Sequence, residues 1–145
     1  MDLKEYFKKL FLVLSTYPMP MNRRRKLLIL GGVNIKGRKV YIGENVIFDR
    51  VYPENIVIGD RVRITANCVI LSHYYDTSRS GCNFNIGRVE ISDDVFIGVN
   101  VIICNSCKIG KGAVVGAGAI VTKDIPPYEV WAGNPAHFFK KRDEF

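Results

Sequence analysis

The histidines are the side chains of this sequence best suited to proton transfer, and there are two of them, His73 and His137. An imidazole changes its charge near neutral pH and is the side chain most often used as a general base. His73 stands in the polar segment Leu71-Ser72-His73-Tyr74-Tyr75-Asp76. A lone histidine is usually structural, so a catalytic role for His73 depends on where the fold places it.

A histidine that acts as a base needs a group that orients its ring through the second nitrogen. Asp76, three residues after His73, ranks first as this catalytic partner. Glu90 and Asp49 remain alternatives, because a fold can bring either carboxylate to the ring from elsewhere in the chain.

The cysteines predict neither a disulfide framework nor a metal site. Four cysteines scattered through a domain of this size are expected to be reduced. Cys104 and Cys107 have the spacing of a metal-binding pair, but two thiols without further ligands do not complete a zinc site. At Cys68 and Cys107 the thiol occupies a place that suits a small apolar side chain, so packing is the expected role.

Length and charge limit the class of protein. The chain has 145 residues, about one domain, and a net charge of +7, which favours anionic partners without choosing among them. We expect no nucleic-acid partner.

The apolar run Leu10–Leu14 is far shorter than the roughly 20 residues that cross a bilayer. No small-residue cleavage site follows it, so we expect a cytoplasmic protein without stable membrane insertion.

A six-residue repeat organises most of the chain. Aliphatic residues recur at this interval at Ile91, Ile97, Ile103, Ile109, Val115 and Val121. Four places after each comes another apolar residue, at Val95, Val101, Cys107, Ala113, Ala119 and Ile125. The same register appears earlier at Ile58, Ile64 and Ile70.

This period matches neither a helix nor an alternating strand, and it indicates short strands joined by corners. Three such sides would close a coil of about 18 residues, and stacked coils would pair their strands in parallel. A β-sandwich with evenly spaced strands is the alternative. The unbroken repeat favours an all-β solenoid over residues 31–136.

The two ends of the chain differ from the repeat. Apolar residues at helical spacing predict an amphipathic helix over 3–14, and a second short helix over 23–30 is expected to stop at Gly31-Gly32. Residues 1–30 would cap the open end of the solenoid. The basic cluster at 23–26 reads as a solvated helix face, with lipid or RNA contact as the alternative. Residues 137–145 are predicted to form a closing helix.

The repeat is interrupted beside His73. Between Ile70 and Ile91 the chain runs for 21 residues where the repeat expects six. About 15 residues, near 74–88, therefore leave the coil as a loop. Functional groups concentrate on loops that a rigid scaffold holds, and this position favours a functional role for His73.

The later motifs carry a resemblance to a known family. They are Ile97-Gly98, the segment Ile109 to Gly118, Thr122-Lys123-Asp124-Ile125-Pro126-Pro127 and Ala132-Gly133-Asn134-Pro135-Ala136. Over residues 31–142 the sequence resembles the maltose, galactoside and capsule or colanic acid O-acetyltransferases, which are hexapeptide-repeat acyltransferases. This resemblance implies a left-handed parallel β-helix and a homotrimer that binds acetyl-CoA between neighbouring coils.

The resemblance also implies roles for individual residues. His73 matches the histidine that deprotonates the acceptor hydroxyl. The positions that match cofactor-binding residues of the family are Val99, Ala117, Thr122, Lys123, His137 and Lys140. The family usually has arginine in the tail, and a lysine lacks the planar fork of arginine. Arg79 and Asn83 in the insert are candidates for substrate binding, with an ordinary surface loop as the alternative.

The expected function is therefore transfer of an acetyl group from acetyl-CoA to a sugar hydroxyl, with a surface-polysaccharide precursor as acceptor. Alternatives on the same fold are acetylation of an amine or of serine, and a non-catalytic solenoid used for assembly. The γ-class carbonic anhydrases share the solenoid, but they need three histidine ligands and this chain has two histidines.

Overall fold

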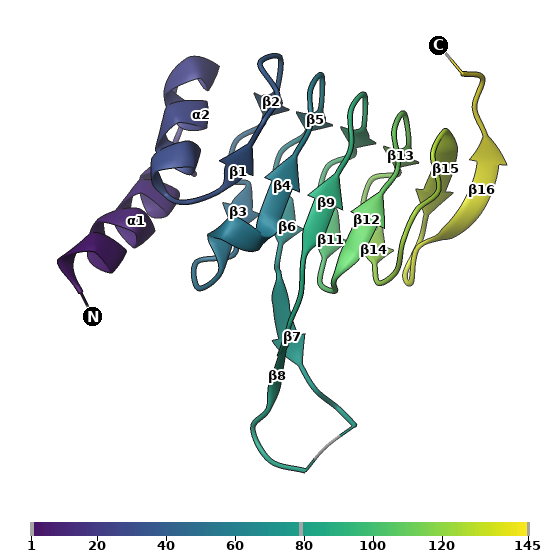
Figure 1. Cartoon of the computed structure of the whole chain (residues 1–145). Coiled ribbons are helices and arrows are strands. Elements are labelled where there is room, and N and C mark those ends of the chain that lie inside the picture. Colours follow the sequence, from purple (N-terminus) through teal and green to yellow (C-terminus); the bar gives the residue numbers. More distant parts are fainter. Residues whose placement is uncertain (1, 79, 145) are drawn as a thin grey trace.

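The main body of the protein is a three-sided coil of short parallel strands (Figure 1). The computed structural model describes residues 2–78 and 80–144. Wall A consists of β1 (Asn34–Ile35), β4 (Ile56–Ile58), β9 (Val89–Ile91) and β12 (Cys107–Ile109). Wall B consists of β2 (Tyr41–Ile42), β5 (Arg63–Ile64), β10 (Phe96–Ile97), β13 (Val114–Val115) and β15 (Glu129–Ala132), with β16 (His137–Lys141) at its edge. Wall C consists of β3 (Ile47–Phe48), β6 (Val69–Ile70), β11 (Ile102–Ile103) and β14 (Ile120–Val121).

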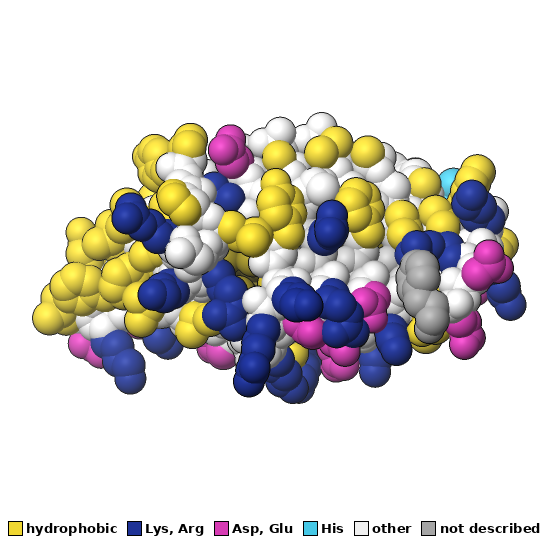
Figure 2. Space-filling model, turned by 90° about the horizontal axis from the view of Figure 1, so that it is seen from above, with side chains coloured by type: hydrophobic (Ala, Val, Ile, Leu, Met, Phe, Trp, Pro, Cys, Tyr) yellow, Lys and Arg dark blue, Asp and Glu magenta, His cyan; other side chains and the backbone are white. Residues whose placement is uncertain are grey.

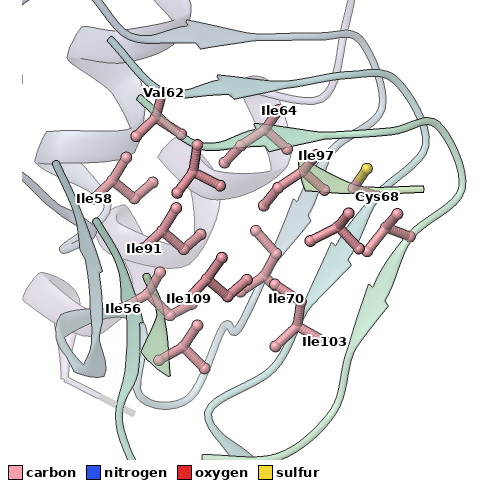
Figure 3. Packing of buried hydrophobic residues seen from close by; sticks show 14 of the residues in the cluster. Ile56, Ile58, Val62, Ile64, Cys68, Ile70, Ile91, Ile97, Ile103 and Ile109 are labelled. Atoms are coloured by element: carbon pink, nitrogen blue, oxygen red, sulfur yellow. The ribbon is translucent and has the colours of Figure 1, made fainter. Parts of the chain in front are cut away.

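The pairing register confirms the coil that the six-residue repeat predicts. Ile64 pairs in register with Ile97, and Ile97 with Val115, so leading positions of successive coils stack directly on one another. These side chains fill the interior of the coil (Figure 3), where Ile58, Ile64, Ile97 and Ile109 have no exposed surface. The two inward positions per repeat therefore form one continuous hydrophobic core.

Two helices close the first coil, as the sequence predicts. Helix α1 spans Leu3–Leu14 and α2 spans Met21–Leu30, with Leu12 and Leu28 buried against the coil. Arg24 is also buried, and its guanidinium donates hydrogen bonds to the backbone carbonyls of Ser15, Tyr17 and Ile42. The expectation of a solvated basic face is wrong for Arg24, because three carbonyl oxygens replace the water that this side chain gives up.

The predicted helix over residues 137–145 is wrong, because residues 137–141 form strand β16. This strand runs antiparallel to β15, from the pair Ala132–His137 to the pair Glu129–Lys141. Strand β15 would otherwise present a row of unpaired backbone groups at the end of the solenoid. Pairing those groups outweighs the weak helical preference of so short a segment.

The residues inserted between Ile70 and Ile91 leave the coil, as the sequence predicts, and they form a β-hairpin (Figure 1). Its strands are β7 (His73–Tyr75) and β8 (Phe84–Ile86). At the base of the hairpin, the backbone N–H of Gly87 donates to the carbonyl of Ser72 over 2.8 Å. This closure lets wall A resume at β9 in register with β4.

All four cysteines are free thiols, and two of them are buried. Cys68 and Cys107 are buried in the core, and burial, aided by the charges of Asp124 and Cys104, raises the pKa of Cys107 to about 12.

Among the described residues, no group of three or more His, Cys, Asp or Glu side chains could hold a metal ion. None of the helices in the described part is both long enough and apolar enough to span a bilayer.

Candidate active site

His73 lies where wall C ends and the hairpin begins. The strand β6 stops at Ile70, and Leu71 and Ser72 turn the chain outward, so His73 is the first residue of β7. About a quarter of its side chain, 26%, is exposed. The ring is therefore held by the protein on one side and accessible on the other.

Asp49 holds the imidazole. Its Oδ2 atom lies 2.6 Å from Nδ1 of His73, and the Asp49 carboxylate has no exposed surface. The backbone N–H groups of Ser72 and His73 donate to the same oxygen, over 2.9 and 3.1 Å. The hydroxyl of Ser72 also lies 2.9 Å from Oδ2. The N–H groups of Val51 and Tyr52 donate to Oδ1, which forms the turn after β3.

These contacts keep the carboxylate ionised. Burial by itself raises the pKa of Asp49, but the hydrogen bonds from His73, Val51, Tyr52 and Ser72 outweigh it and lower the pKa to about 2. An ionised carboxylate only accepts hydrogen bonds, so the hydrogen of a neutral imidazole is assigned to Nδ1. The Nε2 atom of His73 is then left with a free lone pair that can take a proton.

The ranking of Asp76 as the orienting carboxylate is corrected by this geometry. Asp76 is mostly buried, and its carboxylate accepts hydrogen bonds from the backbone N–H and the hydroxyl of Ser78, over 2.9 and 2.6 Å. These bonds form a turn within the hairpin and lower the pKa of Asp76. Glu90 lies on wall A and faces Lys108 over 3.5 Å. Coil stacking, which places β3 beside β6, brings Asp49 rather than its competitors to His73.

Two aromatic rings lie beside His73. The rings of Tyr52 and Phe84 each have their centroids 5.8 Å from that of His73. Tyr75 contacts Phe84 edge to face, also at 5.8 Å. Tyr52 was not among the residues predicted from the sequence. The one signal for it in the sequence is its place three residues after Asp49.

The remaining candidates lie along two corners of the coil. Val99 and Ala117 occupy stacked corners between walls B and C, and the N–H of Gly118 donates to the carbonyl of Val99 over 2.8 Å. Thr122 and Lys123 lie at the corner between walls C and A, the same edge of the coil that carries His73 two coils earlier. The ammonium of Lys123 stands 5.2 Å above the ring of Trp131.

The tail and insert candidates are more scattered. His137 and Lys140 are exposed on β16, at the last coil. Asn83 is exposed on the hairpin, where its amide donates to the carbonyl of Ser80 over 3.3 Å. Arg79 lies outside the described residues. The carboxylate that holds His73 is Asp49, which the sequence offered only as an alternative to Asp76.

Two hollows lie on the surface of a single copy of the chain. A hollow of about 890 Å³ lies over wall B, lined by residues that include Tyr41, Arg63 and Phe96. A smaller hollow of about 310 Å³ lies over wall A. His73 is not among the residues that line these two hollows.

The network around Asp49 predicts a loss of stability in acid. Because the pKa of Asp49 is lower in the folded chain than in the unfolded chain, its contribution is present above about pH 4 and is lost as pH falls through about 2. The lost contribution is about 2 kcal/mol. Urea unfolding across this range is expected to show it in the wild type and in the control Asp143→Asn. A wild-type slope that persists in Asp49→Asn would contradict the assignment.

Comparisons with known proteins agree on one kind of protein. Residues 88–123 match the family model "Bacterial transferase hexapeptide (six repeats)". Over 108 residues the chain is 37% identical to "Putative acetyltransferase YvoF" of Bacillus subtilis (strain 168). The aligned region covers 74% of this chain and 60% of the relative. The chain thus spans less than two thirds of that relative's length.

Two solved structures extend the similarity to the whole coil. A maltose O-acetyltransferase from Clostridium difficile 630 superposes with a TM-score of 0.75 and 28% identity, covering 97% of this chain and 87% of that chain. A galactoside acetyltransferase in complex with coenzyme A superposes with a TM-score of 0.72, covering 97% and 81%. At 24% identity the second likeness concerns the fold alone.

Proposed function

We propose that the chain is a transferase with hexapeptide repeats, like the proteins to which it is similar, and that it transfers an acetyl group from acetyl-CoA to a hydroxyl group of a sugar. A surface-polysaccharide precursor is the proposed acceptor. The proposal includes the left-handed winding of the coil, the homotrimer and the cytoplasmic location that the resemblance implies.

The observation that carries the proposal is the hydrogen bond of 2.6 Å between Nδ1 of His73 and the buried carboxylate of Asp49. It fixes the ring and leaves Nε2 as the proton acceptor on the accessible side. A histidine held by a buried, ionised carboxylate is the arrangement of a general base that must activate a hydroxyl group.

The chemistry needs little beyond this base and good positioning. Nε2 of His73 accepts the hydroxyl proton while the sugar oxygen forms a bond to the thioester carbonyl carbon. The developing oxyanion needs an N–H donor, and the rigid backbone of a coil wall is suited to supply one. As the oxyanion collapses, the carbon–sulfur bond breaks and the imidazolium returns the proton to the departing sulfur. No covalent acyl-enzyme is required.

The residues proposed to bind acetyl-CoA follow the coil from the reacting centre to the tail. Val99 and Ala117 are exposed residues at stacked corners, and this place suits contact with an extended pantetheine arm. Thr122, Lys123, His137 and Lys140 lie toward the last coil, and the two lysines add positive charge for phosphate groups. The Lys123 ammonium already contacts the Trp131 ring, so it would serve a phosphate from a defined position.

Wall C is the surface proposed to meet neighbouring copies. Its outward positions are all large aliphatic residues, at Ile47, Val69, Ile102 and Ile120. Its inward positions are apolar too, so this wall is apolar on both faces, as in sheets that are covered on both sides. Wall C also separates the corner of Val99 and Ala117 from the corner that carries His73. A neighbour packed here would turn the open surface at His73 into a cleft.

This surface gives a direct prediction for assembly. Ile102→Glu is expected to weaken association of the copies by at least about a hundredfold, because burying an unpaired carboxylate costs several kcal/mol. The matched control is Val114→Glu, at the equivalent outward position of wall B. Light scattering after size exclusion measures the mass of each variant. Equal masses for Ile102→Glu and wild type would remove wall C from the interface.

The function itself is tested by the product. The protein is incubated with acetyl-CoA and separate panels of sugars, amino sugars and serine, and the products are identified by mass spectrometry. We expect an acetyl ester on a sugar hydroxyl. Acetylation of amines or of serine instead would establish the alternative reactions on this fold. Absence of any product, with acetyl-CoA bound, would favour the non-catalytic assembly module.

A further inference from the structure

The first thirty residues hold most of the excess positive charge of the chain. They contain seven of its 21 Lys and Arg residues and two of its 14 acidic residues. Their net charge of +5 is the larger part of the total of +7. Arg24 and Arg25 donate hydrogen bonds to the backbone carbonyls of Ile42 and Gly37 in the body, whereas Lys4, Arg23 and Lys26 are exposed. The helical end is therefore a cationic surface on a body that is close to neutral.

The same end exposes the apolar face of α1. Leu3, Tyr6, Phe7 and Leu14 follow the spacing of one helix face and are between 39% and 69% exposed. Leu12, the buried residue of this helix, lies on roughly the opposite side. The apolar face of α1 is thus turned away from the coil, which is the reverse of its usual direction in a globular protein.

Exposed apolar side chains continue beyond α1. Tyr17, Met21, Ile29 and Leu30 are each more than 40% exposed. Figure 2 shows hydrophobic side chains gathered over the end that the helices form, with Lys and Arg side chains among and beside them. Soluble proteins rarely leave such a contiguous surface without a partner.

We infer that the helix pair α1–α2 docks on the surface of a lipid bilayer that contains anionic lipids. An amphipathic helix with aromatic and aliphatic residues on one face and flanking cations lies in the headgroup layer of such a bilayer. Juxtaposed basic residues add attraction to anionic headgroups. A second copy of this chain fits less well, because two cationic helical ends would repel each other. The inference does not rest on the proposed function, since no residue of the His73 site takes part.

Binding of the full chain to vesicles tests the inference. We expect co-sedimentation with vesicles of phosphatidylcholine mixed with phosphatidylglycerol, weakening as salt is raised, and much weaker binding to phosphatidylcholine alone. The double variant Tyr6→Ser with Phe7→Ser is expected to lower partitioning at least about tenfold. Both side chains are about half exposed, so their loss leaves the core intact.

The matched control for the rings is Tyr41→Ser with Phe96→Ser, two rings of similar exposure on wall B. For the charges, Lys4→Gln with Lys26→Gln is expected to cost about fivefold per cation, whereas Lys36→Gln with Lys108→Gln on wall A leaves binding unchanged. Equal losses in the helix variants and in the controls would overturn the proposal. So would a smaller particle mass for the Tyr6 and Phe7 variant without lipid, because a second copy would then occupy this face.

Discussion

Replacing His73 with alanine is expected to lower the turnover of acetyl transfer by about 10² to 10⁴, the range that a general base contributes. The loss should appear in kcat, because Nε2 acts on the hydroxyl proton in the transition state rather than on bound substrate. Steady-state kinetics with the acceptor identified by the product assay measure the effect. Calorimetric titration with CoA is expected to show unchanged affinity, since the proposed CoA-binding residues lie on other coils.

The control for this variant is Thr77→Ala, at the far end of the same hairpin. It tests whether any change in the hairpin lowers turnover, and it is expected to behave as wild type. If His73→Ala turns over as fast as wild type, the imidazole is not the base. Equal losses in both variants would indicate that the hairpin acts only as a structural element.

The second large effect is expected for Asp49→Asn. An asparagine fills the same space, but it is uncharged. Both oxygens of Asp49 accept hydrogen bonds from backbone N–H groups, and the NH₂ group of an asparagine cannot accept them. The amide therefore either loses backbone hydrogen bonds or turns the imidazole to the wrong tautomer. We expect turnover to fall by about 10² to 10⁴, as for other carboxylates that hold a catalytic histidine.

The matched variant is Asp76→Asn, which removes the same charge from the carboxylate that sequence proximity favours. Its bonds to Ser78 are local to the hairpin, and a change of less than about fivefold in turnover is expected, because neutral hydrogen bonds replace charged ones there. The comparison decides between the two carboxylates. A large loss in Asp76→Asn with normal turnover in Asp49→Asn would reverse the assignment.

The coil was predictable because its signal repeats. Each turn of the solenoid places an aliphatic residue at the same inward position, so a local irregularity at one repeat does not obscure the others. The hairpin could be located for the same reason, as a gap in the register between Ile70 and Ile91. Helix α1 was recognisable from its apolar spacing, although the sequence does not reveal that this face points outward.

The partner of His73 was harder to predict because stacking, not sequence separation, sets it. Asp49 precedes His73 by one coil, and the register of β3 on β6 brings the two corners together. The repeat alone does not reveal this neighbour, because one coil of about 18 residues back from Ile70 leads to Tyr52, whereas the residue that pairs with Ile70 is Phe48. The strand β16 was missed because its partner is the exposed edge of the last coil, which is a property of the finished fold.

Strand β16 has a consequence for how many chains can join. A stack of parallel strands could in principle continue into another molecule and grow into a fibre, since each free edge is a template for the next. Here the outermost strand is β16, whose Lys140 and Lys141 disfavour pairing with another chain at one pole, and the helices cover the other pole. Growth along the axis is disfavoured at both poles, which leaves the flanks as the surfaces through which the molecule can form a finite particle.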